Sequence, residues 1–209
     1  LYQQGNAGQA HALMQDLAQQ QPELQDSLII TEAEMRSSNG DPQGAIALIN
    51  DALRDQPDNT ELLYSRAMTA EKVGDLAQLE KDLKRIITLN PDDASALNAL
   101  GYTLGNRTDR LDEAYQYVSR ALELRPDDPA ILDSMGWVLY QRGEPEAARD
   151  YLRRAYEKFP DPEVAAHYGE VLWVLGAQNQ ARQVWRDTLE SDPDAPHIRE
   201  VMEKLGARL

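Results

Sequence analysis

The sequence has no cysteine, so it can form neither disulfide bonds nor thiolate metal sites. It has no run of about 18 apolar residues, the minimum for a membrane-spanning helix. The histidines are His11, His167 and His197, and no two of them lie at metal-ligand spacing on one helix. The glycines occur singly, without the clustering of a phosphate-binding loop. We therefore predict no enzyme activity, no metal and no cofactor.

Positive charge is also scarce. Lysine and arginine number 21 against 36 aspartates and glutamates, which gives a formal net charge of −15. A chain this acidic is a poor partner for nucleic acid or for an anionic membrane surface. Two explanations of the charge stay open. It can keep an elongated apolar stack soluble, or it can attract basic partners.

What the sequence does contain is a regular spacing of prolines. Six of them follow one another at intervals of 35, 34, 35, 34 and 33 residues: Pro22, Pro57, Pro91, Pro126, Pro160 and Pro193. A period of this length indicates one supersecondary unit repeated in tandem. Stacked repeats rarely build catalytic pockets, and they present long surfaces to other proteins.

Residues 129–160 show the pattern within one unit. Two stretches carry apolar residues at helical spacing, and Gly143-Glu144-Pro145 separates them. Gly143 can adopt the left-handed conformation that ends a helix, and Pro145 suits the first turn of the next one. The small residues Gly136 and Ala148 allow the two helices to approach closely. The pattern predicts helix, turn, helix.

Equivalent residues recur in the other copies. The turn glycine recurs as Gly5, Gly40, Gly74, Gly143 and Gly176. The small residue of the first helix recurs as Ala33, Ala67, Gly101, Gly136 and Gly169. The small residue of the second helix recurs, with Leu79 as the exception, as Ala10, Ala45, Ala114, Ala148 and Ala181.

Over essentially the whole chain this pattern resembles the tetratricopeptide repeat (TPR). The resemblance implies an all-α solenoid of antiparallel helix pairs that forms a right-handed superhelix. It places a truncated repeat, with only its second helix, at 1–25 and a capping helix at 196–209. Five full repeats lie between them, at 26–59, 60–93, 94–128, 129–161 and 162–195. Leu1 falls at the end of an incomplete pair, so we expect a fragment with more repeats before it and self-association through the uncapped end.

In this family the first helices line a concave groove, and the resemblance selects specific positions for it. We predict the following protein-binding residues: Tyr64, Met68, Asn98, Tyr102, Asp133, Trp137, Tyr140, Glu170 and Trp173. Large aromatic residues there indicate a binding strip for a peptide. The alternative, that these rings pack on neighbouring helices, stays open. The groove is acidic, so a basic or neutral segment fits it better than a free carboxylate, and Trp185 falls on a core position instead.

Three segments narrow the resemblance: 97–104, 129–137 and 167–173, which read LNALGYTL, PAILDSMGW and HYGEVLW. They resemble the C-terminal half of a family of large TPR lipoproteins of Gram-negative bacteria, especially pseudomonads. The resemblance implies an N-terminal lipid anchor in the outer membrane. It also implies an adaptor that presents peptidoglycan hydrolases to a carboxyl-terminal processing protease.

We therefore expect a non-catalytic protein-binding scaffold on the periplasmic side of the outer membrane. The lipid anchor would lie outside this fragment, which would not insert into the membrane itself. Two alternatives stay open. One is a structural assembly factor of an envelope secretion or pilus machine, and the other is the non-catalytic repeat module of a larger envelope enzyme.

Overall fold

The structure, a computed structural model, describes residues 7–209. Leu1 and Gly5 lie outside the described residues, as do the side chains of Ala7 and Ala10. Within 7–209 the secondary structure consists of twelve α-helices and one short 3-10 turn, Pro22–Leu24. None of these helices combines the length and the apolar composition that crossing a membrane requires.

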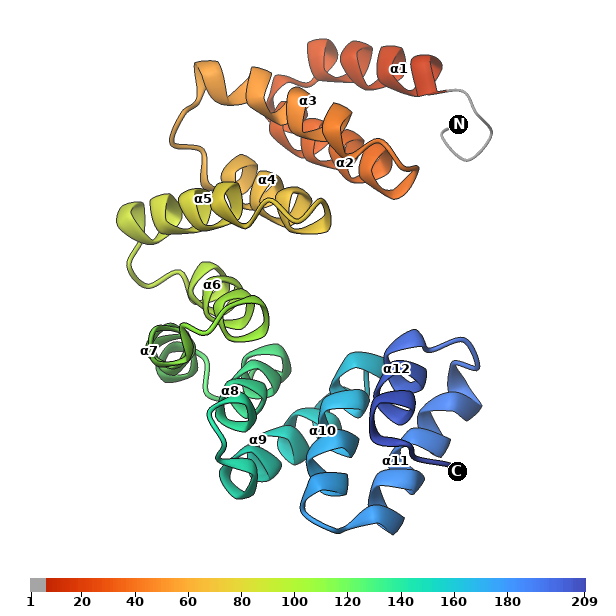
Figure 1. Cartoon of the computed structure of the whole chain (residues 1–209). Coiled ribbons are helices and arrows are strands. Elements are labelled where there is room, and N and C mark those ends of the chain that lie inside the picture. The colour runs from red at the N-terminus through yellow and green to blue at the C-terminus, as the bar shows by residue number, and fades with distance from the viewer. Residues whose placement is uncertain (1–6) are drawn as a thin grey trace. The chain divides into compact units, whose positions relative to one another are not determined.

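The chain divides into two compact units (Figure 1). The first runs to Ala96 and the second is Leu97–Leu209. The first unit contains α1 (Ala7–Gln20), α2 (Gln25–Ser38), α3 (Pro42–Asp55), α4 (Thr60–Lys72) and α5 (Leu76–Leu89). The second contains most of α6 (Ala94–Arg107), then α7 (Leu111–Leu124), α8 (Pro129–Gln141), α9 (Pro145–Lys158), α10 (Pro162–Val174), α11 (Gln178–Ser191) and α12 (Pro196–Leu205).

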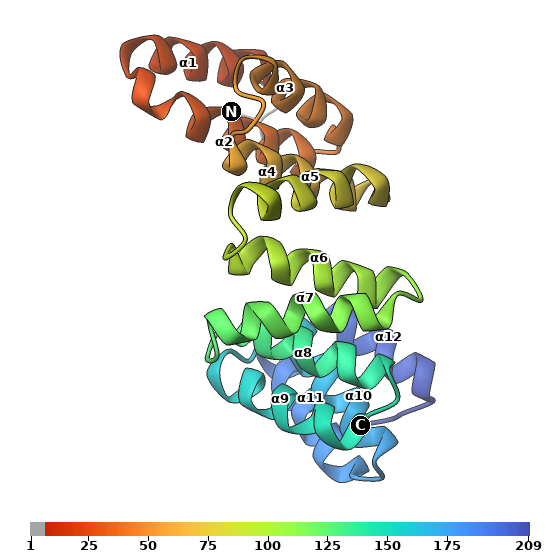
Figure 2. The ribbon, with the colours of Figure 1, turned by 90° about the vertical axis from the view of Figure 1, so that its left-hand side faces the viewer.

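Consecutive helices pack as antiparallel pairs within each unit, α2 with α3 and α4 with α5 in the first, α8 with α9 and α10 with α11 in the second. Figure 2 shows α6 and α7 of the second unit lying alongside one another. This arrangement confirms the predicted all-α architecture of helix pairs. The exact division into repeats stays a prediction, and the two-unit division was not predicted.

The turns within the pairs follow the glycine pattern. Four of the predicted turn glycines have φ between 77° and 85°, in the left-handed region: Gly40, Gly74, Gly143 and Gly176. At Gly143 this conformation follows the end of α8, and Glu144 N then donates back to Leu139 O at 2.9 Å. A residue with a Cβ would be strained there, which explains why the sequence places glycine at this point of the unit.

Small residues set the distance between paired helices. A Cβ added to Gly169 of α10 would lie 2.0 Å from Nε1 of Trp185 in α11, and a Cβ on Gly136 of α8 would lie 2.5 Å from Cγ of Leu152 in α9. Trp185 is fully buried, which confirms its predicted core position. In these two pairs the first helix therefore meets its partner through a glycine, and the larger residue comes from the second helix.

One core position of the first unit holds an ion pair instead of apolar side chains. Arg66 of α4 donates from Nε and Nη2 to the two carboxylate oxygens of Asp82 in α5, at 2.8 and 2.6 Å. Asp82 is buried, and Gln78 also donates to it at 2.9 Å. This two-point geometry satisfies a buried carboxylate that would otherwise destabilise the pair.

Candidate functional site

Five of the nine predicted binding residues belong to one connected network in the second unit. Tyr102 comes from α6, Asp133, Trp137 and Tyr140 come from α8, and Glu170 comes from α10. The spacing along α8 places its three residues on one helical face, because residues four and three apart lie on the same side of a helix. The first helices of three successive pairs therefore supply one site.

His167 of α10 connects this network. Its Nδ1 lies 3.0 Å from both carboxylate oxygens of Asp133, to which it donates. Its ring stacks on the indole of Trp137 with centroids 4.0 Å apart, and the ring of Tyr102 lies 6.2 Å away. His167, Asp133 and Trp137 are all buried, with 8%, 6% and 6% of their surface exposed. One imidazole thus joins α8 to α10 by a hydrogen bond and by stacking.

Charge around His167 decides its protonation. Burial disfavours the imidazolium and by itself lowers the pKa, but the adjacent Asp133 charge, the Asp133 hydrogen bond, Glu163 and Glu170 all favour it. The balance raises the pKa of His167 above its ordinary value. In its charged form His167 therefore neutralises part of an otherwise acidic site.

The aromatic hydroxyls and the indole each donate to a neighbour. Tyr102 donates to Glu163 at 2.5 Å, and Trp137 Nε1 donates to Asn106 Oδ1 at 3.2 Å. Tyr140 lies with its ring centroid 5.4 Å from that of Trp137. These bonds hold the rings in one orientation, so the site is preorganised before any partner arrives.

A buried carboxylate closes one end of the network. Glu170 Oε1 accepts from Tyr140 at 2.9 Å and from Lys204 of α12 at 2.7 Å. Burial and the neighbouring Glu170 raise the pKa of the Tyr140 hydroxyl, so this tyrosine stays a neutral donor.

Two other predicted residues of the second unit lie differently. Trp173 packs toward α11, with its ring 5.7 Å from Trp185 and with the Arg182 guanidinium 4.9 Å from its centroid. These contacts are the ones expected if the Trp173 ring packs on a neighbouring helix and does not bind a partner. Asn98 is half-buried, and within residues 7–209 its Oδ1 has no hydrogen-bond partner. The binding roles of both residues stay predictions.

Tyr64 and Met68 belong to the first unit, and both are half-buried on α4. Burial raises the pKa of the Tyr64 hydroxyl, and the charges of Asp93 and Glu71 raise it further. The local environment of Tyr64 is therefore acidic, like that of the network in the second unit. The part of these two residues in binding stays a prediction.

Four members of the site were not among the predicted binding residues: Asn106, Glu163, His167 and Lys204. Glu163, seven residues before Glu170, falls on a groove position that the TPR resemblance selects, although it is not among the nine binding residues. His167 precedes Glu170 by three residues, so helical spacing was a usable signal for it. Lys204 reaches the site from a different helix, and nothing in the sequence pairs it with Glu170. Its contact depends on how α12 packs on α10.

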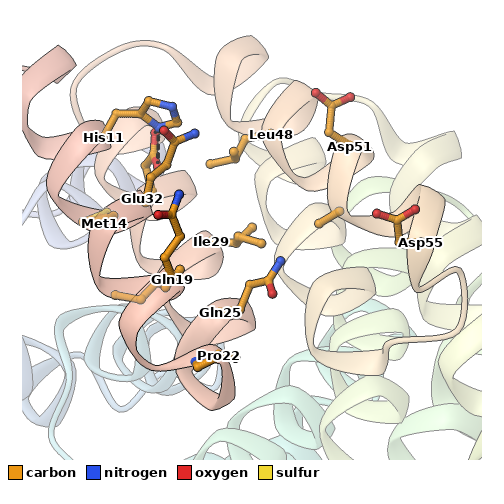
Figure 3. Close-up of a pocket in the computed structure, with 14 residues that line it drawn as sticks. His11, Met14, Gln19, Pro22, Gln25, Ile29, Glu32, Leu48, Asp51 and Asp55 are labelled. Atoms are coloured by element: carbon orange, nitrogen blue, oxygen red, sulfur yellow. Dashed lines mark hydrogen bonds and ion pairs between the residues drawn. The ribbon is translucent and has the colours of Figure 1, made fainter.

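The first unit contains a separate hollow between α1, α2 and α3, with a volume of about 580 Å³. Figure 3 shows Ile29 and Leu48 facing it, with Asp51 and Asp55 at one side on α3. On its other side His11 Nδ1 lies 2.8 Å from Glu32 Oε1. The hollow has an apolar floor and an acidic rim, and no pattern in the sequence predicted it.

Comparison with known proteins gives a sequence relative. Over 170 residues the chain is 45% identical to "TPR repeat-containing protein PA4667" of Pseudomonas aeruginosa. The aligned region covers 81% of this chain and 29% of the relative. The chain therefore spans less than a third of that protein's length.

Solved structures share the fold. TTC0263, a TPR protein of Thermus thermophilus, superposes with a TM-score of 0.74 at 20% identity, covering 86% of this chain and 98% of that one. The type IV pilus biogenesis factor PilW superposes with a TM-score of 0.72 at 20% identity, covering 87% of this chain and 86% of PilW. PilF of Pseudomonas aeruginosa superposes with a TM-score of 0.66 at 18% identity, covering 86% of this chain and 90% of PilF. At these identities the likeness concerns the fold alone.

The tetratricopeptide repeat family matches the sequence in two overlapping stretches, residues 92–161 and 134–196. These stretches include α6, α8 and α10, which supply the network around His167. With the helix pairs, the turn glycines and the structural neighbours, they show that the chain belongs to the tetratricopeptide repeat family.

Proposed function

We propose that this TPR chain is a non-catalytic adaptor that holds a segment of a partner protein against the acidic, aromatic face of its second unit. The observation that carries the proposal is the network around His167, in which three first helices contribute aromatic rings and carboxylates to one preorganised site. Rigid aromatic groups supply contact area with little loss of entropy, and carboxylates select basic or neutral partners.

The finer proposal is an adaptor of the bacterial envelope. It would present peptidoglycan hydrolases to a carboxyl-terminal processing protease on the periplasmic side of the outer membrane, with the lipid anchor outside this chain. Support comes from the three segments that resemble the pseudomonad lipoprotein family and from the Pseudomonas aeruginosa relative. A stable role in assembling a pilus machine is the second candidate, favoured by the fold shared with PilW and PilF.

The test is capture of partners from a pseudomonad envelope extract, with the full-length protein as bait and mass spectrometry as readout. The variant Tyr102→Ala/Tyr140→Ala removes two half-buried rings from the site. The matched control is Tyr115→Ala, which removes an exposed tyrosine from the second helix α7 of the same unit.

Recovery of a processing protease and hydrolases, reduced in the double variant and kept in the control, would support the adaptor. Recovery of pilus or secretion components alone would support the assembly role. Equal recovery by the double variant and the control would contradict a binding site around Tyr102 and Tyr140.

A further inference from the structure

The ion pair between Glu170 and Lys204 is unequal in its burial. The Glu170 side chain is 4% exposed, whereas the Lys204 side chain is 61% exposed and reaches the carboxylate from α12 at 2.7 Å. A carboxylate in a buried position needs a cation or several donors to remain charged. A lysine that is mostly in water keeps its hydration and pairs only weakly. The carboxylate is therefore held in place while its cation is exchangeable.

The surroundings of Glu170 have the composition of a cation-binding site. Tyr140 donates to the same oxygen as Lys204 does, and its ring lies beside that of Trp137. Asp133 and Glu163, whose charges act on His167 together with that of Glu170, add negative charge to the same network. Aromatic rings beside a carboxylate attract alkylammonium and guanidinium groups by cation–π and charge-assisted contacts. Lys204 thus displays, from within the chain, the kind of group that this end of the site accepts.

We propose that Glu170 recognises a lysine or arginine side chain of the bound protein segment, and that Lys204 is its built-in competitor. The inference rests on the proposed function and names the partner chemistry: a basic segment whose cation replaces Lys204 on Oε1. Removal of the Lys204 ammonium then leaves Glu170 ready for the partner. Removal of the Glu170 charge abolishes the preference for a cation.

The experiment titrates a capped peptide, Gly-Lys-Gly, into the 209-residue chain and follows the indole N–H signal of Trp137 by NMR. Substitution Trp137→Phe assigns that signal, and capped Gly-Glu-Gly controls for charge. We expect Lys204→Ala to tighten lysine-peptide binding on the order of fivefold, the size of a weak, partly exposed ion pair. Lys204→Arg, which keeps a competing cation, is the matched control and should leave binding near that of the unaltered chain.

The second arm removes the carboxylate charge. Glu170→Gln keeps an acceptor for Tyr140 and should abolish the preference for lysine over glutamate. In that background Lys204→Ala should have no further effect. Unchanged binding in Lys204→Ala would overturn the inference. Since Lys204 is exposed, this result does not depend on whether Glu170→Gln folds.

The two proposals fail in different ways. Suppose that Tyr102→Ala/Tyr140→Ala loses partner capture and that Lys204→Ala leaves peptide binding unchanged. This result would support the adaptor proposal and contradict the cation site at Glu170. Suppose instead that peptide binding changes as expected in Lys204→Ala and Glu170→Gln, but that no partner is captured from envelope extract. This result would support the cation site and contradict the adaptor proposal.

Discussion

His167 contacts Asp133 and Trp137, both of which belong to a different helix. Asp133 accepts a hydrogen bond from its Nδ1–H, Trp137 stacks on its ring, and Glu163 and Glu170 add to the negative charge around it. A single imidazole therefore links the electrostatics of the site to the packing of α8 on α10. Its protonation should be visible in the stability of the second unit.

The first prediction concerns pH. The pKa of His167 is raised in the folded chain, so the folded state binds the proton more tightly than the unfolded state does. The resulting stabilisation is complete below the unfolded pKa of about 6.5 and is lost as pH rises through the higher folded pKa. Urea unfolding followed by tryptophan fluorescence should show this loss, because all three tryptophans lie in the second unit.

The control for this prediction is His167→Gln, which keeps a side-chain donor for Asp133 without a titrating group. The difference in unfolding free energy between the unaltered chain and this variant should shrink as pH rises above about 6.5. Parallel pH profiles for the two proteins would show that His167 does not gain its proton affinity on folding.

At the scale of helices, the distance between partners depends on glycine. In the second prediction, Gly169→Ala places a methyl group against the buried indole of Trp185, where the added Cβ would lie 2.0 Å from Nε1. Because the indole has no exposed direction in which to retreat, we expect the second unit to lose about 2–3 kcal/mol of unfolding free energy. Urea titration measures this loss.

The comparison variant for that prediction is Gly8→Ala in α1, where no atom of the described part of the chain lies within 4 Å of an added Cβ. It should be neutral or slightly stabilising, because alanine favours helix more than glycine does. Equal effects of the two substitutions would mean that close approach of α10 and α11 is not the reason for Gly169.

The hollow in the first unit also has an explanation at the scale of helices. Ala18 of α1 lines it. Eight residues after the recurring small position of the second helix, the other copies carry larger apolar side chains: Leu53, Ile87, Leu122, Tyr156 and Leu189. The smaller side chain of Ala18 leaves space that a larger residue occupies in those copies.

The third prediction follows from that comparison. Ala18→Leu should fill part of the hollow and stabilise the first unit by about 1 kcal/mol, the usual gain of cavity filling. Amide hydrogen exchange in α1 and α2 measures it, and Ala12→Leu, at an exposed position of α1, is the matched control. If both variants slow amide exchange in α1 equally, the stabilisation comes from the helix-forming or apolar nature of leucine and not from filling the hollow.

At the scale of the whole chain, each unit has its own core. In the second unit Trp185, Leu172, Ile198 and their neighbours form one buried cluster. The site around His167 lies entirely within this unit. Its integrity should therefore not depend on α1–α5.

The fourth prediction is that residues 94–209, which begin with α6, fold independently. The fragment should keep the near-ultraviolet circular dichroism of its three tryptophans and the pH dependence expected for His167. Cooperative urea unfolding of the fragment measures this. A fragment that binds a hydrophobic dye and lacks a cooperative transition would show that the second unit needs the first.

Helix pairs, turn glycines, small contact residues and the burial of Trp185 were predictable from the order of residues alone. Each follows from local rules, helical spacing or backbone conformation, or from a period that repeats these rules. Predictability ended where side chains from separate helices meet. The contacts of Asp133 with His167, of Glu170 with Lys204 and of Arg66 with Asp82 depend on how helices rotate and tilt against each other, which spacing along one helix does not encode. The same limit applies to Trp173: the TPR resemblance selected it for the groove, and only the packing of α10 on α11 shows that its ring contacts Trp185 and Arg182.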